Sequence, residues 1–187
     1  MNTQTARVLA EIRTFIDDDS RITDPRAAIA FAEHYLEGVP ASVLAARSTE
    51  RVYEAVMAHY AQIAHPRSPG TPLIEIVSID DSASDCDTAL ISVADDMAFL
   101  VDTVALAVRA TGAEIDWTLH PVVAVTCDSD GRPSAISGAN EHPPGDHRTS
   151  ESLIRVEFAA PAGLDRDGLV EQVRASLVDV HTVVTDW

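Results

Sequence analysis

One stretch, residues 94–112 (ADDMAFLVDTVALAVRATG), constrains the fold more than any other part of the chain. Its apolar residues recur every three or four positions, which predicts a helix with one buried face. Asp95 and Asp96 stand where an acid caps a helix N-terminus and opposes its partial positive charge. Strand-like sequences lie on both sides, at 88–93 and 114–126. A strand, a helix and a strand with such short joints predict the opening of a ferredoxin-like unit.

The first part of the chain shows only the helical period. Apolar residues at helical spacing predict three helices, and prolines or glycines end them. In the second of these, the acid of an Asp-Pro pair is the expected cap and the proline takes the first helical position. The helices are expected at 3–16, from Asp24-Pro25 to Gly38, and from Ser48 or Thr49 to Pro66. Together they form an N-terminal helical segment over residues 1–68.

From Thr71 onward the hydrophobic period changes to two, which indicates strands. The run from Asp128 to Gly131 is typical of a hairpin turn. A proline at Pro121, within the longest strand, favours an edge position or a bulge. Strands are expected at 73–79, 88–93, 114–126, 133–137 and 152–159, and helices at 94–112 and about 165–184. Residues 71–187 are therefore expected to form one α+β domain.

The order of these elements predicts the sheet. A ferredoxin-like fold ends on a strand after its second helix, and no such strand follows here. Strand 73–79 can take the vacant edge as an antiparallel partner of strand 88–93. The sequence thus predicts an antiparallel sheet with two helices on one face. Leu90, Val122 and Ala124 give the other face apolar character, so either the N-terminal helices or a second copy must cover it.

The charge of the chain excludes several classes of partner. The net charge of −17 repels phosphate backbones and anionic lipid surfaces, so neither nucleic acid nor a membrane is expected to bind. The N-terminus lacks a basic region followed by an apolar run, and no stretch has membrane-spanning length. The two cysteines do not form a CxxC pair, and a reducing compartment is the default for them. A cytoplasmic protein is expected.

The composition also excludes several kinds of chemistry. All 13 basic residues are arginine, which removes Schiff-base catalysis and a phosphate-loop lysine. The eight glycines form no GxG pair, so the dinucleotide fingerprint is missing. No G-x-S-x-G elbow indicates a hydrolase. No catalytic residue and no cofactor are therefore expected in this chain.

Two groups of side chains contain residue types that can bind metal ions, and neither has the spacing of a known metal site. The first, in EHPPGDH, lacks helical spacing and a nearby cysteine. The second lacks the glycine and the glutamate that an EF-hand loop requires at its sixth and twelfth positions. Neither group is expected to bind a metal ion. The groups are His142, Asp146 and His147, and Asp80, Asp81, Asp85 and Asp87.

Several segments resemble the N-terminal region of the large NAD-dependent glutamate dehydrogenases of bacteria, the very long chain type. The specific part is ADDMAFLVDTV at 94–104 followed by HPVVAV at 120–125. Ala98 departs from the pattern, since the family usually has proline there, and the 133–149 loop matches poorly. Weaker matches keep the family's order: HYLEGVP at 34–40, SPGTP at 68–72, ESLIRVE at 151–157 and DW at 186–187.

This resemblance implies a function that the residues themselves do not show. It makes the chain the first of several ACT-like regulatory modules, with the catalytic domain far downstream. The parent reaction would convert L-glutamate and NAD to 2-oxoglutarate, ammonia and NADH, so NAD belongs to the parent chain. The implied partners are other domains of the parent dehydrogenase and its copies, in a homo-oligomer. The alternatives are a stand-alone sensor of a small amino acid and a purely structural interaction module.

ACT-like modules often hold an amino acid near the first strand–helix joint, and the resemblance therefore directs attention to Asp95, Asp96, Phe99 and Asp102. The acids could bind the ligand's ammonium group, and Asp102, seven residues after Asp95, would point the same way with Phe99 between them. Capping, or contact with an arginine of another domain, is the alternative. Two acids at a helix N-terminus also disfavour a ligand's carboxylate. His120, on the polar face of its strand, is expected to be either an interface or a structural residue.

Overall fold

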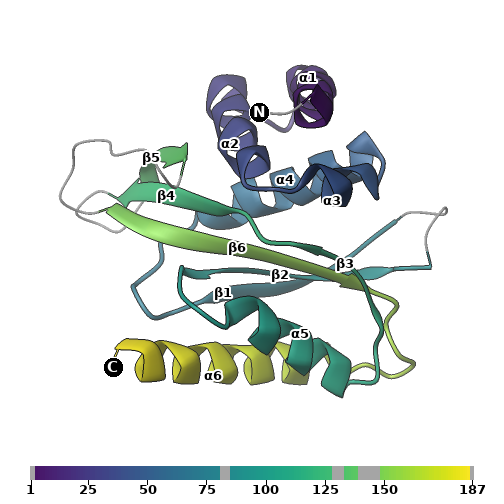
Figure 1. Ribbon diagram of the computed structural model, residues 1–187, viewed down its shortest axis with the longest axis vertical. Helices are drawn as coiled ribbons and strands as arrows, with labels where there is room; N and C mark the ends of the chain where they lie inside the picture. The colour runs from purple at the N-terminus through teal and green to yellow at the C-terminus, as the bar shows by residue number, and fades with distance from the viewer. Residues whose placement is uncertain (1–2, 81–84, 128–132, 139–147, 186–187) are drawn as a thin grey trace. The chain divides into compact units, whose positions relative to one another are not determined.

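The computed structural model describes residues 3–80, 85–127, 133–138 and 148–185 (Figure 1). Contacts divide the chain into two compact units. The first combines residues 1–66 with 121–151, and the second combines 67–120 with 152–187. The sequence-based division at residues 68–71 stays a prediction about domains. The predicted hairpin turn at Asp128–Gly131 lies outside the described residues.

Four helices lie in the described residues of the first unit. They are α1 (Thr3–Asp18), α2 (Pro25–Glu37), α3 (Ala41–Ala45) and α4 (Thr49–Ile63). The predicted starts are confirmed for α2, where the Ala27 N–H donates to Asp24 Oδ1 at 3.0 Å, and for α4, where the Arg51 N–H donates to Ser48 Oγ at 3.3 Å. Such caps each contribute about 1 kcal/mol. Helix α3 lies where the sequence predicts only a break.

A hairpin completes the first unit. Its strands are β4 (Val122–Cys127) and β5 (Pro133–Gly138), which pair antiparallel with a bulge between Thr126 and Cys127. Helix α2 contacts both strands. Within the helices, the ring centroids of the fully buried Phe31 and Tyr35 lie 5.6 Å apart, and Tyr35 Oη lies 2.9 Å from His59 Nδ1.

The second unit contains the predicted ferredoxin-like elements. They are β1 (Leu73–Ser78), β2 (Thr88–Asp95), α5 (Leu100–Ala110), β3 (Ile115–Leu119), most of β6 (Arg148–Phe158) and α6 (Arg166–Thr185). Strand β1 pairs antiparallel with β2, from Leu73 opposite Val93 to Ser78 opposite Thr88. The hydrogen-bonded order is β1-β2-β6-β4-β5, and β3 also pairs with β6. The prediction that residues 73–79 occupy the edge beside strand 88–93 is confirmed.

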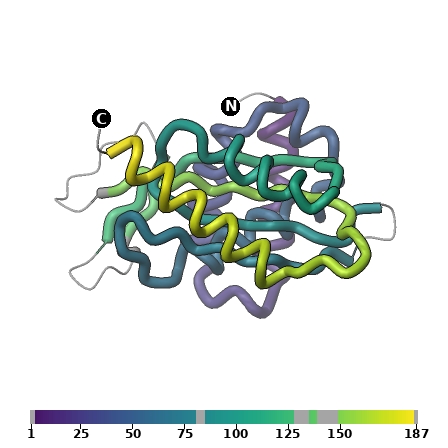
Figure 2. Tube along the Cα trace, turned by 90° about the horizontal axis from the view of Figure 1, so that it is seen from below, coloured from purple at the N-terminus to yellow at the C-terminus, as the bar shows by residue number. Residues whose placement is uncertain are grey.

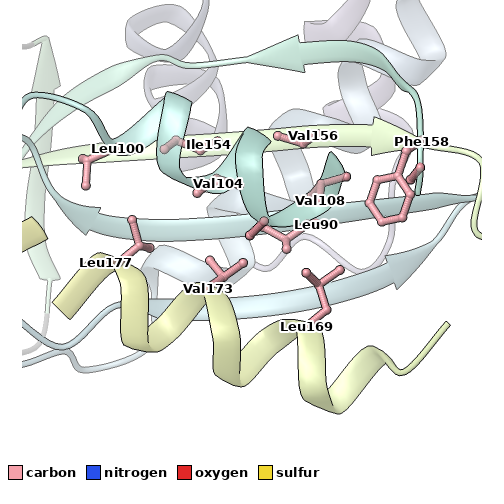
Figure 3. Packing of buried hydrophobic residues seen from close by; sticks show 12 residues of the cluster. Leu90, Leu100, Val104, Val108, Ile154, Val156, Phe158, Leu169, Val173 and Leu177 are labelled. Atoms are coloured by element: carbon pink, nitrogen blue, oxygen red, sulfur yellow. The ribbon is translucent and has the colours of Figure 1, made fainter. Parts of the chain in front are cut away.

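Helices α5 and α6 contact each other and lie together on one face of the strands (Figure 2). Apolar side chains from both helices meet those of β2 and β6 in a continuous core (Figure 3). The predicted fold class, helices followed by an antiparallel sheet with two helices on one face, is confirmed. Leu90 was expected on the opposite face, but it packs in this helix-covered core. Strand β2 is apolar on both faces, so its sequence does not show which face meets the helices.

Two predicted boundaries are wrong. The single strand at 114–126 is two strands, because Pro121 follows β3 and lacks the N–H that a ladder needs. Strand β2 continues to Asp95, and α5 begins only at Leu100. Within the described residues, no helix is both long enough and apolar enough to cross a membrane.

Candidate functional site

Asp95, the last residue of β2, is the centre of a polar network in the second unit. Its carboxylate accepts hydrogen bonds from Arg67 Nη2 and from the Gly70 N–H, both at 2.5 Å. His181 Nε2 of α6 lies 3.5 Å from Oδ2. Gly70 has a φ of +73°, and a Cβ there would lie 3.2 Å from His181 Cε1, so only glycine suits this turn. The Asp95 network ties the segment before β1 and the end of α6 to β2.

The network holds Asp95 in its charged form. Burial opposes ionisation, but the hydrogen bonds from Arg67 and Gly70 and the charges of Arg67 and His181 outweigh it. The pKa of Asp95 therefore lies below its ordinary value. The side chain of Arg67 is only 8% exposed, so each partner compensates a charge that would otherwise be desolvated alone.

The space beside this network is small. Arg67, Asp95, Leu100 and His181 border a cavity of about 10 Å³. A single water molecule needs roughly that much room. An amino acid does not fit beside Asp95 in this conformation, and the geometry therefore favours the structural alternative for this residue.

The expectation that Asp95 caps the helix is wrong. The N-cap of α5 is Phe99, whose φ of 71° is left-handed and whose side chain makes no capping hydrogen bond. Asp95 belongs to a strand, so the helical repeat that would align it with Asp102 does not exist. Asp102 lies exposed in the first turn of α5, where its negative charge interacts favourably with the partial positive charge of the helix N-terminus.

Asp96 and His120 form a second, weaker electrostatic pair. His120 Nε2 lies 2.6 Å from Oγ of Ser152, which is fully buried. Desolvation lowers the pKa of His120, and the charge of Asp96 partly offsets this. Desolvation likewise raises the pKa of Asp96, and His120 partly offsets it. Both side chains keep contact with solvent, so the pair can respond to pH.

His120→Gln should remove part of the pH dependence of stability. Because the folded pKa of His120 is lowered, the unfolded chain binds its proton first. The wild type should therefore lose stability as the pH falls from about 6.5 toward the folded pKa. Urea midpoints between neutral and mildly acidic pH should decline less steeply in the variant. His34→Gln, in α2, is the matched control, and identical slopes in wild type and H120Q would contradict the assignment.

An exposed apolar ridge lies along α5. Phe99 is 68% exposed and Leu106 is 69% exposed, and Asp102 and Leu106 stand four residues apart on one helix face. We call Phe99, Asp102 and Leu106 the α5 ridge. Phe99 and Asp102 were predicted as candidate contact residues from the sequence, and Leu106 was not. The available signal was that Leu106 falls outside the buried spacing of Leu100, Val104 and Val108.

Sequence reasoning also missed the partners of Asp95. Arg67 precedes it by 28 residues and His181 follows it on the last helix. The only sequence signal was SPGTP at 68–72, which directly follows Arg67. Neither its spacing nor its composition indicates an ion pair.

The two groups of side chains that were weighed as metal ligands, and not expected to bind a metal ion, lie only partly within the described residues. His142, Asp146, His147 and Asp81 lie outside the described residues. Asp87 has a structural role: its Oδ1 accepts from the Ala160 N–H and from Thr88 Oγ1, both at 2.9 Å. Those hydrogen bonds, led by the one from Ala160, lower the pKa of Asp87. Within the described ranges, no three His, Cys, Asp or Glu side chains are grouped to hold a metal ion.

Comparisons with known proteins place the chain in a family. The family model for the ACT1 domain of glutamate dehydrogenase matches residues 31–173. An NAD-specific glutamate dehydrogenase of Halomonas elongata is 27% identical over 179 residues, which cover 90% of this chain and 11% of that protein. No solved structure matches. Because the family model covers most of the chain, the chain belongs to the glutamate dehydrogenase ACT1 domain family.

Proposed function

We propose that this chain is the N-terminal regulatory and assembly module of a large NAD-dependent glutamate dehydrogenase. The family match over residues 31–173 carries the proposal, together with a relative of which the chain spans only 11%. The parent would oxidise L-glutamate to 2-oxoglutarate and ammonia with NAD, on residues outside this chain. The module itself would bind no cofactor and would act in the cytoplasm.

The geometry of the candidate residues supports a role without chemistry. Asp95 is held by Arg67 and Gly70, and His120 is held by Ser152. A proton carrier in catalysis must be free to reach a reacting group. These side chains are engaged within their own unit, which suits structure and communication better than turnover.

The open reading frame beyond the codon for Trp187 tests the proposal most directly. A dehydrogenase domain in the same frame is the expected result. A stop codon at that point, with no dehydrogenase domain in frame, would overturn the proposal.

We further propose that the α5 ridge contacts another domain of the parent or another copy of it. The proposal is based on Phe99, the N-cap of α5, and Leu106, within α5, whose large apolar side chains are each more than two-thirds exposed. Most of the parent's surface lies outside this chain, since the chain spans 11% of the relative. The charge of Asp102 would then fix the register of an apolar contact.

Phe99→Gly should have opposite effects on the stability of the module and on the assembly of the intact dehydrogenase. Glycine relieves a left-handed residue, so the stability of the module should rise by about 1 kcal/mol. The same change removes the exposed ring, so assembly of the intact dehydrogenase should weaken. Urea denaturation measures the first effect and sedimentation velocity the second. Thr103→Gly is a glycine control within α5, and unchanged assembly in both F99G and Leu106→Asp would contradict the proposed interface.

The alternative function, a sensor that binds an amino acid at the strand–helix joint near Asp95, is less well supported. The cavity of about 10 Å³ beside Asp95 leaves no room for a ligand of that size. A purely structural interaction module remains compatible with the α5 ridge. Effector-dependent activity of the intact dehydrogenase that survives deletion of this module would favour the structural module over the regulatory one.

A further inference from the structure

The first unit contains a cavity of about 790 Å³ lined by α2, α4, β5 and the 19–23 segment. None of the residues of the Asp95 network or of the α5 ridge lines it. Small-molecule sites in proteins measure roughly 300–1,000 Å³ and are lined mainly by apolar and aromatic side chains. The cavity thus has the size of a metabolite site.

Short side chains on two facing helices leave this space open. Ala27 and Ala30 of α2 and Ala58, Ala61 and Ala64 of α4 all line it. Four of these alanines are exposed and Ala58 is partly buried, so the space is a hollow open to solvent and not an interior void. Their short side chains leave room in it for an apolar group.

Part of the lining is aromatic. The ring centroids of Phe31 and Tyr60 lie 5.4 Å apart, and Met57 and Ile136 are among the other apolar residues of the lining. Aromatic rings and a methionine thioether adapt to apolar ligands of varied shape. The body of a ligand held here must be apolar.

Three hydrogen-bonded polar side chains, Asp19, Arg21 and Tyr53, also line the cavity. Asp19 accepts from Tyr53 Oη at 2.6 Å and from Arg21 Nη2 at 2.6 Å. The hydrogen bond from Arg21, then that from Tyr53, holds the pKa of Asp19 well below its usual range. Burial, then the charge and hydrogen bond of Asp19, raises the pKa of Tyr53 to about 12. Asp19 and Arg21 therefore neutralise each other, and Tyr53 stays a neutral donor.

Glu54 supplies the uncompensated charge. Its carboxylate lines the cavity and is exposed, and among the described residues it has no ion-pair or hydrogen-bond partner. With Asp19 paired to Arg21, the rim carries one net negative charge. The chain as a whole carries −17. This field repels a carboxylate and attracts an amine.

We propose that this cavity binds a small molecule with an apolar body and one positively charged amine head, the body lying between α2 and α4 and the head at Glu54. The proposal does not rest on the proposed dehydrogenase function, because it is argued only from the lining of this cavity, which belongs to the first unit.

Three probes of equal length test the proposal on the intact protein: 3-phenylpropylamine, 3-phenylpropanol and 3-phenylpropionate. The ¹³C methyl resonance of Met57, assigned with Met57→Leu, reports binding inside this cavity and not elsewhere. The amine should shift the signal saturably, and it should bind about tenfold more tightly than the carboxylate, with the alcohol between them.

Variants of the lining distinguish the contribution of the ligand's amine head to binding from that of its apolar body. Glu54→Gln should weaken the amine about fivefold and leave the alcohol unchanged, whereas Glu11→Gln in α1 should change neither. Ala61→Leu, or Ala30→Leu if the first does not fold, should abolish binding of all three probes. No saturable shift of the Met57 signal in the folded wild type would identify the cavity as a packing defect and overturn the proposal, as would tightest binding of the carboxylate.

Discussion

Leu90→Ala should lower the free energy of unfolding by about 2–5 kcal/mol, the range for truncating a buried leucine in a core that relaxes only partly. Leu90 is fully buried, and it packs against α5 and α6 in the core of the second unit. Its truncation removes apolar contacts and leaves a cavity between the sheet and both helices. Urea denaturation followed by the fluorescence of the buried Trp117 measures the effect as a lower midpoint.

Leu106→Ala is the matched control, because it is the same substitution on the exposed side of α5. Leu106 is 69% exposed, so its truncation should change stability by no more than about 0.5 kcal/mol. Equal losses in L90A and L106A would show that the helix-covered core is not where the structure places it.

Asp95→Asn should lower the free energy of unfolding by about 2–3 kcal/mol, somewhat less than for a fully buried ion pair. The variant keeps the size of the side chain but removes the negative charge of Asp95 from beside the guanidinium of Arg67, which is 8% exposed. Asp96→Asn, at the next position, should leave stability unchanged or slightly raised. Desolvation already disfavours the charged form of Asp96, which is the opposite of the situation at Asp95.

Acid titration sharpens this test. The folded pKa of Asp95 is depressed, so its contribution to stability is complete above the unfolded value and is lost as the pH falls below about 4. The difference between wild type and D95N should therefore be constant at neutral pH and shrink below that value. A difference that persists undiminished at low pH would mean that packing, and not charge, makes Asp95 important.

Much of the fold could be predicted because its signals are local. The caps at Asp24 and Ser48 set the starts of α2 and α4, and both were visible as short sequence motifs. The change of period near Thr71 separates helices from strands, and the element order alone placed β1 beside β2. The caps and the change of period depend on residues within a few positions of one another, whereas the place of β1 follows from the order of the elements along the chain.

The candidate site could be predicted only as a set of residues. Asp95 followed by a helical pattern is equally consistent with a cap and with a strand end. In the structure Asp95 ends a strand, and α5 begins only after Phe99. Phe99 has a left-handed backbone conformation, which a sequence pattern would assign to glycine. Only the folded chain brings Arg67 and His181 to Asp95.

The sequence by itself therefore determined the type and order of most elements, the edge position of β1 and the family motif around residues 94–104. Only the tertiary structure shows which face of β2 meets the helices. It also shows that Asp95, which the sequence predicts as a helix cap, is the centre of an ion-pair network. The physical reason is the sequence separation over which each interaction acts. Capping and periodicity act between neighbours in the chain, whereas burial and ion pairing act between residues that are close only after folding.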